Sequence, residues 1–291
     1  MTALQLRSPN SQPPTPKKQN GMSTESPSSD VLLVDRQGPV WRATLNRPAV
    51  RNAFDERLIA ALQAWADDVT RAADAGEARV AVIAGAGPVF SAGADLAWMQ
   101  RMRDYSREDN VRDADTAAAL FGALDALPVP LVGRIQGAAL GGGAGLAAVC
   151  DVVVAADDAV FGFTEVRLGI LPAVIGPFVI AKIGLSAARA LFLTGGRFPA
   201  PQAHRLGLVH EVVPAAELDT VVDVVVRDLL LGAPSAQRRV KTLLRAIADR
   251  PAADVRPLTS AALADQRVSA DGQDGLAAFL HKRPAKWVVE P

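Results

Sequence analysis

Apolar residues recur along the chain at two spacings, which predict strands and helices in turn. Residues 31–48, VLLVDRQGPVWRATLNRP, hold two short apolar runs around a Gly-Pro pair, as expected for two strands joined by a turn. Residues 55–71 repeat apolar side chains at helical spacing. Continuous apolar runs of strand length, typical of strands buried on both faces, then occupy residues 79–85, 130–137 and 151–156.

Helical segments separate and follow these strands. Residues 107–127 carry an apolar stripe, which is Val111, Ala114, Ala118, Leu120, Leu124 and Leu127. The segment GLAAVC, residues 145–150, is a candidate short buried helix, and from about residue 184 the chain is almost all helical in pattern. This alternation predicts an α/β fold built of wound ββα units.

The pattern divides the chain into three parts. Residues 1–30 are rich in proline, serine and small polar residues, so we expect a disordered tail, with Met22 as an alternative start. Residues 31–215 form the expected ββα core with the active site, and residues 216–291 the C-terminal helical region.

Composition narrows the classes of function. The chain has 291 residues, 49% of them hydrophobic, and equal numbers of basic and acidic residues, 31 each, which argues against nucleic acid or an anionic membrane as a main partner. The chain has one cysteine and three scattered histidines, which predict neither an internal disulfide nor a metal site. We therefore expect the protein in a reducing cytoplasm. No run approaches the ~20 apolar residues that span a membrane.

The segment GAALGGGAGLAAVCD, residues 137–151, is the first candidate for chemistry. It lacks the Lys-Ser/Thr pair of a phosphate-binding P-loop, and Gly141, Gly143 and Gly145 have the wrong spacing for a dinucleotide fingerprint. Either the glycines allow close packing of helix on strand, or a sharp turn leaves backbone N–H groups at a helix start free to stabilise negative charge on a carbonyl oxygen.

A second loop has the same design. FSAGADL, residues 90–96, also follows a buried strand and leads into a helix through small residues. If the two loops lie at the ends of neighbouring strands, each can offer one N–H to the same oxygen. Their small side chains also leave room for a long, thin ligand.

These motifs together resemble the enoyl-CoA hydratase/isomerase (crotonase) family. Five segments occur in the family's order over residues ~31–291: LNRPAVRNAF, GPVFSAGADL, GAALGGGAGLAAVCD, FGFTEVRLGILP and LTGGRFPAPQAHRLGLVHEVVP. In detail, the sequence is most similar to the bacterial 3-methylglutaconyl-CoA hydratase branch. The resemblance implies a crotonase-like spiral of ββα units, an acyl-CoA thioester substrate with no separate cofactor, and a homotrimer or homohexamer. It also implies that residues 216–291 serve oligomerisation and close the CoA site.

The resemblance further assigns roles to residues. Ala94 and Gly142 match the positions of the two backbone N–H groups of the oxyanion hole, and Glu165 matches a catalytic glutamate. The remaining matches fall in substrate-binding segments and are Arg51, Ala53, Ala92, Asp95, Leu96, Gly141 and Gly145.

The chain departs from the family pattern at Gly145. Hydratases with the fullest pattern keep a second glutamate there, so Glu165 is left to handle the protons alone. Hydration is the favoured reaction, with double-bond isomerisation by a single proton shuttle, or acyl-CoA binding without turnover, as alternatives. A methylglutaconyl chain carries a terminal carboxylate, for which Arg101, Arg103 and Arg167 are candidate partners.

Overall fold

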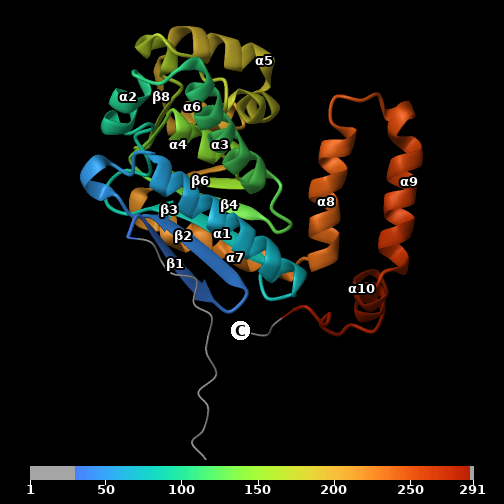
Figure 1. Cartoon of the computed structure of the whole chain (residues 1–291). Coiled ribbons are helices and arrows are strands. Elements are labelled where there is room, and N and C mark those ends of the chain that lie inside the picture. The colour runs from blue at the N-terminus through green and yellow to red at the C-terminus, as the bar shows by residue number, and fades with distance from the viewer. Residues whose placement is uncertain (1–29, 289–291) are drawn as a thin grey trace, which may run out of the picture.

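Two β-sheets form the centre of the molecule in the computed structural model, which describes residues 30–288 (Figure 1). The predicted disordered tail lies outside the described residues apart from Asp30. The larger sheet has the order β1-β2-β3-β4-β6-β9, with β1 and β2 antiparallel and the other pairs parallel. Its strands are β1 (Leu32–Gln37), β2 (Val40–Leu45), β3 (Val80–Gly85), β4 (Leu131–Ile135), β6 (Val152–Ala156) and β9 (Glu211–Val213).

The smaller sheet was not predicted. It consists of β5 (Ala138–Leu140), β7 (Val160–Gly162) and β8 (Arg197–Pro199). The apolar run 130–137 therefore does not lead straight into the glycine loop, because β4 ends at Ile135 and the chain reaches the loop through β5. The predicted strands at 31–48, 79–85 and 151–156 are confirmed.

The structure has ten α-helices within residues 30–288. They are α1 (Glu56–Asp74), α2 (Leu96–Met102), α3 (Arg107–Asp125), α4 (Gly142–Val149), α5 (Gly176–Thr194), α6 (Ala200–Arg205), α7 (Leu218–Leu231), α8 (Pro234–Ile247), α9 (Ala252–Val268) and α10 (Ala270–Leu280), with short 3-10 turns η1 (Pro48–Val50), η2 (Glu165–Leu168) and η3 (Ala215–Glu217). The stripe predicted for α1 is buried as expected. The helix predicted at 107–127 is confirmed as α3, but its stripe is buried only near the C-terminal end, at Leu120 and Leu124. The prediction is wrong for Val111, which is 43% exposed, and for Ala114 and Ala118, which are also exposed.

The C-terminal helices divide into two groups. Helix α7 packs on the large sheet against β3, β4 and β6, so the region after residue 215 begins as part of the core layer. Helices α8 and α9 run side by side away from the body (Figure 1). The guanidinium of Arg79 joins the two parts, since it donates hydrogen bonds to the carbonyl oxygens of Leu230, Gly232 and Trp287.

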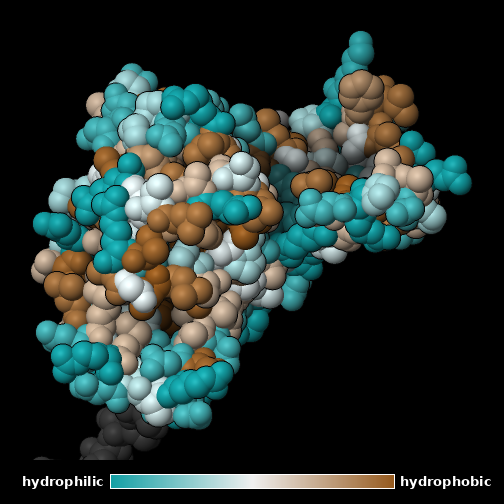
Figure 2. Space-filling view, turned by 90° about the horizontal axis from the view of Figure 1, so that it is seen from above, coloured by the Kyte–Doolittle hydropathy of each residue, from teal (hydrophilic) through white to brown (hydrophobic). Residues whose placement is uncertain are grey.

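Apolar side chains remain exposed on these helices and on α5. Helices α8, α9 and α10 form a projecting arm, and Figure 2 shows apolar surface on this arm as well as on the body. The large exposed side chains of the arm are Val240, Leu244, Leu258, Leu263, Val268, Leu276, Phe279 and Leu280. Among the described residues, α5 alone has the length and the mean hydropathy, 1.4, of a membrane span, which the sequence pattern did not anticipate. Gly184, at φ 76° and ψ 158°, breaks it into two shorter helices.

Candidate active site

Two of the predicted site segments are joined through their backbones. The amide of Ala92 donates to the carbonyl of Arg51 at 2.9 Å, and the amide of Phe54 donates to the carbonyl of Gly93 at 2.7 Å. The amide of Asp95 returns a hydrogen bond to the carbonyl of Phe54 at 2.8 Å. The loop that resembles a CoA-binding segment thus lies directly beside the SAGAD loop.

The glycine loop approaches the SAGAD loop from the other side. Ser91 pairs with β5, donating to Ala138 O at 2.9 Å and accepting from Leu140 N at 3.0 Å. Gly93 has φ +91°, and a Cβ there would lie 2.9 Å from Leu140 O, so a side chain would force the loops apart. Contact between backbones brings Ala94 and Gly142 to one place.

The N–H groups of Ala94 and Gly142 are unpaired donors. Neither has a hydrogen-bond acceptor among residues 30–288, and Gly142 is the first residue of α4, where the helix cannot supply one. Both residues line the same pocket as Glu165. Partial positive charge at the start of α4 favours an anion there.

This pocket is mostly apolar. It has a volume of about 330 Å³, and Glu165 and Asp113 are its only charged lining residues within the described part of the chain. The other lining residues are Phe54, Ile59, Ala94, Trp98, Met102, Asn110, Ala114, Ala117, Phe121, Gly142, Ile170, Leu171, Pro172, Ala173, Val174 and Ile175. Such a lining suits an acyl chain with polar chemistry confined to a few points.

The carboxylate of Glu165 lies beside the glycine loop. Glu165 is the first residue of η2, and its Oε1 is 3.3 Å from the position that a Cβ on Gly141 would take. Its Oε2 is buried without a hydrogen-bond partner among the described residues. Burial raises the pKa of Glu165 above its ordinary value of 4.5, which brings it closer to the range useful for proton transfer.

Gly145 faces apolar side chains rather than the pocket. A Cβ at this position would lie 2.3 Å from Cγ2 of Ile175 and 3.1 Å from Cε1 of Phe121. A carboxylate side chain has no space there unless Ile175 moves. The place of the absent second glutamate is therefore filled by the pocket wall.

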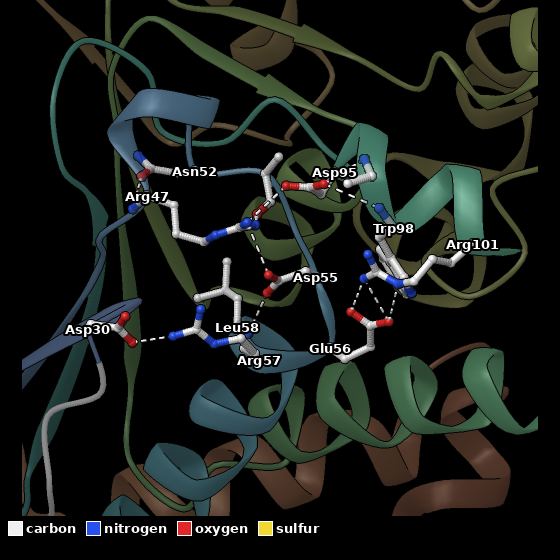
Figure 3. A network of polar contacts seen from close by, with 12 residues as sticks. Asp30, Arg47, Asn52, Asp55, Glu56, Arg57, Leu58, Asp95, Trp98 and Arg101 are labelled. Atoms are coloured by element: carbon white, nitrogen blue, oxygen red, sulfur yellow. Dashed lines mark hydrogen bonds and ion pairs between the residues drawn. The ribbon is translucent and has the colours of Figure 1, made fainter.

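Arg47, which the sequence did not single out, holds the loops in position (Figure 3). Its Nη2 lies 3.0 Å from Oδ2 of Asp55 and 2.9 Å from Oδ2 of Asp95. Asp95 also accepts hydrogen bonds from the amides of Ala97 and Trp98 and so caps α2. Burial raises the pKa of Asp95, but these amides and Arg47 lower it more, and the net shift is downward.

Several predicted residues lie at the surface. Leu96 is 76% exposed, and Arg51 is exposed at φ 56°. None of the three candidate arginines lines the pocket: Arg101 makes an ion pair with Glu56 (Figure 3), Arg103 pairs with Asp104, and Arg167 donates to Thr194 O.

Most of the pocket residues that the sequence did not predict come from α3 and from residues 170–175. Asn110, Asp113, Ala117 and Phe121 recur at intervals of three or four residues, so they share one face of that helix. A polar pair at helical spacing beside an apolar stripe is the signal that could have identified them.

The family model for enoyl-CoA hydratase/isomerase matches residues 35–289. The chain belongs to the enoyl-CoA hydratase/isomerase family. It is 35% identical over 260 residues to the 2,3-dehydroadipyl-CoA hydratase of Escherichia coli, covering 87% of this chain and 96% of that one. It is 30% identical to the human mitochondrial enoyl-CoA hydratase domain-containing protein 3, covering 85% of this chain and 80% of that protein.

Solved structures of this family have the same fold. An enoyl-CoA hydratase from Shewanella pealeana superposes with a TM-score of 0.85 at 35% identity, covering 88% of this chain and 96% of that chain. The predicted crotonase-like α/β architecture is thereby confirmed.

Proposed function

We propose that the protein adds water across the 2,3 double bond of a 2-enoyl-CoA thioester. The Glu165 carboxylate takes a proton from water as the water oxygen bonds to C3. Electrons of the double bond move onto the thioester oxygen, giving an enolate that accepts hydrogen bonds from the N–H groups of Ala94 and Gly142. Glu165 then returns its proton to C2, and the product is a 3-hydroxyacyl-CoA.

One juxtaposition supports the proposal above all others. An unpaired buried carboxylate oxygen and two unpaired backbone N–H groups line the same apolar pocket. The N–H pair can stabilise charge that develops on a carbonyl oxygen, and the carboxylate can move protons next to it. The names of the relatives, which include enoyl-CoA hydratases, agree with this chemistry.

The CoA part of the substrate is proposed to lie along the surface between Arg51 and Leu96. Both are exposed and belong to the two loops joined by the Ala92–Arg51 hydrogen bond. Ala53 is buried under this surface, next to the pocket residue Phe54.

Double-bond isomerisation is the second candidate. A single carboxylate near the oxyanion donors can remove a proton from C2 of a 3-enoyl-CoA and return it to C4. The apolar wall at Gly145, which excludes a second glutamate, is the observation that favours it.

The lining of the pocket bears on which acyl chain the substrate carries. The sequence motifs resemble 3-methylglutaconyl-CoA hydratases, and the Escherichia coli relative is named for a dicarboxylic chain. The pocket, however, offers no lysine, arginine or histidine to a terminal carboxylate among its described lining residues. We therefore propose a neutral short or branched chain as the preferred substrate.

A homo-oligomer, trimer or hexamer, is proposed for the assembly. The apolar side chains left exposed on α8–α10 would be covered by another copy. Light scattering after size exclusion should give three or six protomers, and a monomer would exclude this arrangement.

The function is tested by incubating purified protein with crotonyl-CoA and with 3-hexenoyl-CoA, and following enone absorbance and product mass. A hydratase removes the absorbance of crotonyl-CoA and adds the mass of one water. An isomerase converts 3-hexenoyl-CoA to a conjugated product of unchanged mass. If neither thioester reacts although both bind, the protein does not have the proposed function.

A further inference from the structure

Asp113 stands out in the pocket because it is a second acid that the proposed chemistry does not use. It lies on α3 eight residues before Phe121, whose ring packs 6.3 Å from that of Phe54. Phe54 in turn contacts the position of Gly142, at the oxyanion donors. Eight residues of helix span about 12 Å, so Asp113 lies toward the far end of the acyl pocket and not at the reacting carbons.

The surroundings of Asp113 leave its negative charge uncompensated. Among residues 30–288 no ion pair to Asp113 is formed, and the nearest acidic side chain that acts on it, Glu56 on α1, is itself ion-paired with Arg101. Burial, helped by Glu56, raises the pKa of Asp113, whereas the indole of Trp98 on α2 lowers it. That indole N–H lies near the carboxyl without closing a hydrogen bond of ordinary geometry.

We propose that Asp113 determines specificity by acyl charge: the pocket accepts enoyl-CoA chains with a neutral end and discriminates against chains that end in a carboxylate. The inference rests on the proposed function, because it assumes that this pocket holds the acyl chain of a CoA thioester. Because Asp113 and Glu165 are the only charged residues that line it between residues 30 and 288, the pocket repels an anionic chain.

The size of the effect follows from Coulomb's law. Two like charges roughly 7 Å apart at an effective dielectric constant of about 20 disfavour binding by about 50-fold, and partial exposure of Asp113 reduces this to roughly 10-fold. A longer dicarboxylic chain brings its carboxylate closer to Asp113, so adipyl-CoA should bind more weakly than glutaryl-CoA.

The test measures dissociation constants by calorimetry at pH 8 for butyryl-CoA, glutaryl-CoA and adipyl-CoA. The wild-type protein should bind butyryl-CoA about 10-fold more tightly than glutaryl-CoA, and adipyl-CoA more weakly still. Asp113→Asn should reduce this ratio to within threefold. Asp115→Asn, which removes the same charge from an exposed position of α3 outside the pocket, should keep the wild-type ratio.

Using a ratio cancels any general effect of the substitutions on the shared CoA part. The inference is overturned if the wild-type protein binds glutaryl-CoA as tightly as butyryl-CoA, or if Asp113→Asn leaves the ratio unchanged. Hydration of crotonyl-CoA is measured on the same samples. A charge preference without turnover refutes only the hydratase function, turnover without the preference refutes only the role of Asp113, and failure of every thioester to bind refutes both.

Discussion

Substituting alanine for Gly145 should destabilise the protein, although alanine normally stabilises a helix. In the interior of a helix, glycine to alanine gains about 1 kcal/mol. At Gly145 the new Cβ would lie 2.3 Å from Ile175 Cγ2, where Ile175 is only 4% exposed and packed into the core. Overpacking of this kind costs roughly 1–3 kcal/mol. The overlap is severe, so we expect a net loss of about 1–2 kcal/mol.

The assay is urea unfolding at a fixed protomer concentration, followed by circular dichroism, with two comparisons. Gly122→Ala is the matched control, because Gly122 lies inside α3 and a Cβ there meets nothing within 4 Å; it should stabilise by up to about 1 kcal/mol. In an Ile175→Ala background the 2.3 Å contact with Cγ2 is removed, whereas the contacts of 3.0 Å with the Cβ of residue 175 and 3.1 Å with Cε1 of Phe121 remain. Gly145→Ala should therefore cost less in that background than in the wild-type protein.

This smaller cost of Gly145→Ala in the Ile175→Ala background is what the packing argument demands. If Gly145→Ala stabilises the wild-type protein as much as Gly122→Ala does, Ile175 does not block the position. The apolar wall would then fail to explain why a second carboxylate is absent from the site.

Three further predictions concern single side chains. Arg47→Ala should lower the free energy of unfolding by roughly 3 kcal/mol, because it leaves the nearly buried carboxylates of Asp55 and Asp95 without their cation. Urea unfolding measures the loss of stability, and a loss below about 1 kcal/mol would contradict this role of Arg47. Glu165→Gln should raise thermal stability at pH 7, since burial raises the pKa of this carboxyl and the folded state therefore disfavours its charged form. That gain should shrink as the pH falls through the raised pKa and vanish well below 4.5, so a pH-independent gain would point to another cause. Cys150, 1% exposed with its pKa raised to about 12 by burial, should resist a thiol reagent until the protein unfolds, and rapid labelling of the native state would contradict its burial.

The sequence could predict those strands and helices whose apolar pattern lies within their own residues. The strands at 79–85 and 151–156 are continuous apolar runs, and the stripe of α1 repeats at helical spacing, so each pattern needs no knowledge of a partner. The three-residue strands of the small sheet carry too short a pattern to detect, and pairing between distant segments creates them.

The candidate site divides in the same way. Ala94, Gly142 and Glu165 belong to local motifs and line one pocket, as expected. The contact between Gly145 and Ile175 joins residues thirty positions apart, and only the folded chain reveals it. The first half of α3 was assigned to the core because its apolar residues repeat at helical spacing. That spacing does not distinguish a helix face packed in the core from one that lines a pocket. Asp113 was missed for this reason.

The central claim is that Glu165 moves the protons while two backbone N–H groups hold the thioester oxygen. The most direct test compares Glu165→Gln with the wild-type protein in steady-state hydration of crotonyl-CoA, and measures butyryl-CoA binding on the same samples. Glu217→Gln, at an exposed glutamate outside the pocket, is the control and should keep wild-type kinetics. We predict that Glu165→Gln loses turnover by on the order of 100-fold or more and binds butyryl-CoA within threefold of wild type. Near-normal turnover by Glu165→Gln would contradict the account.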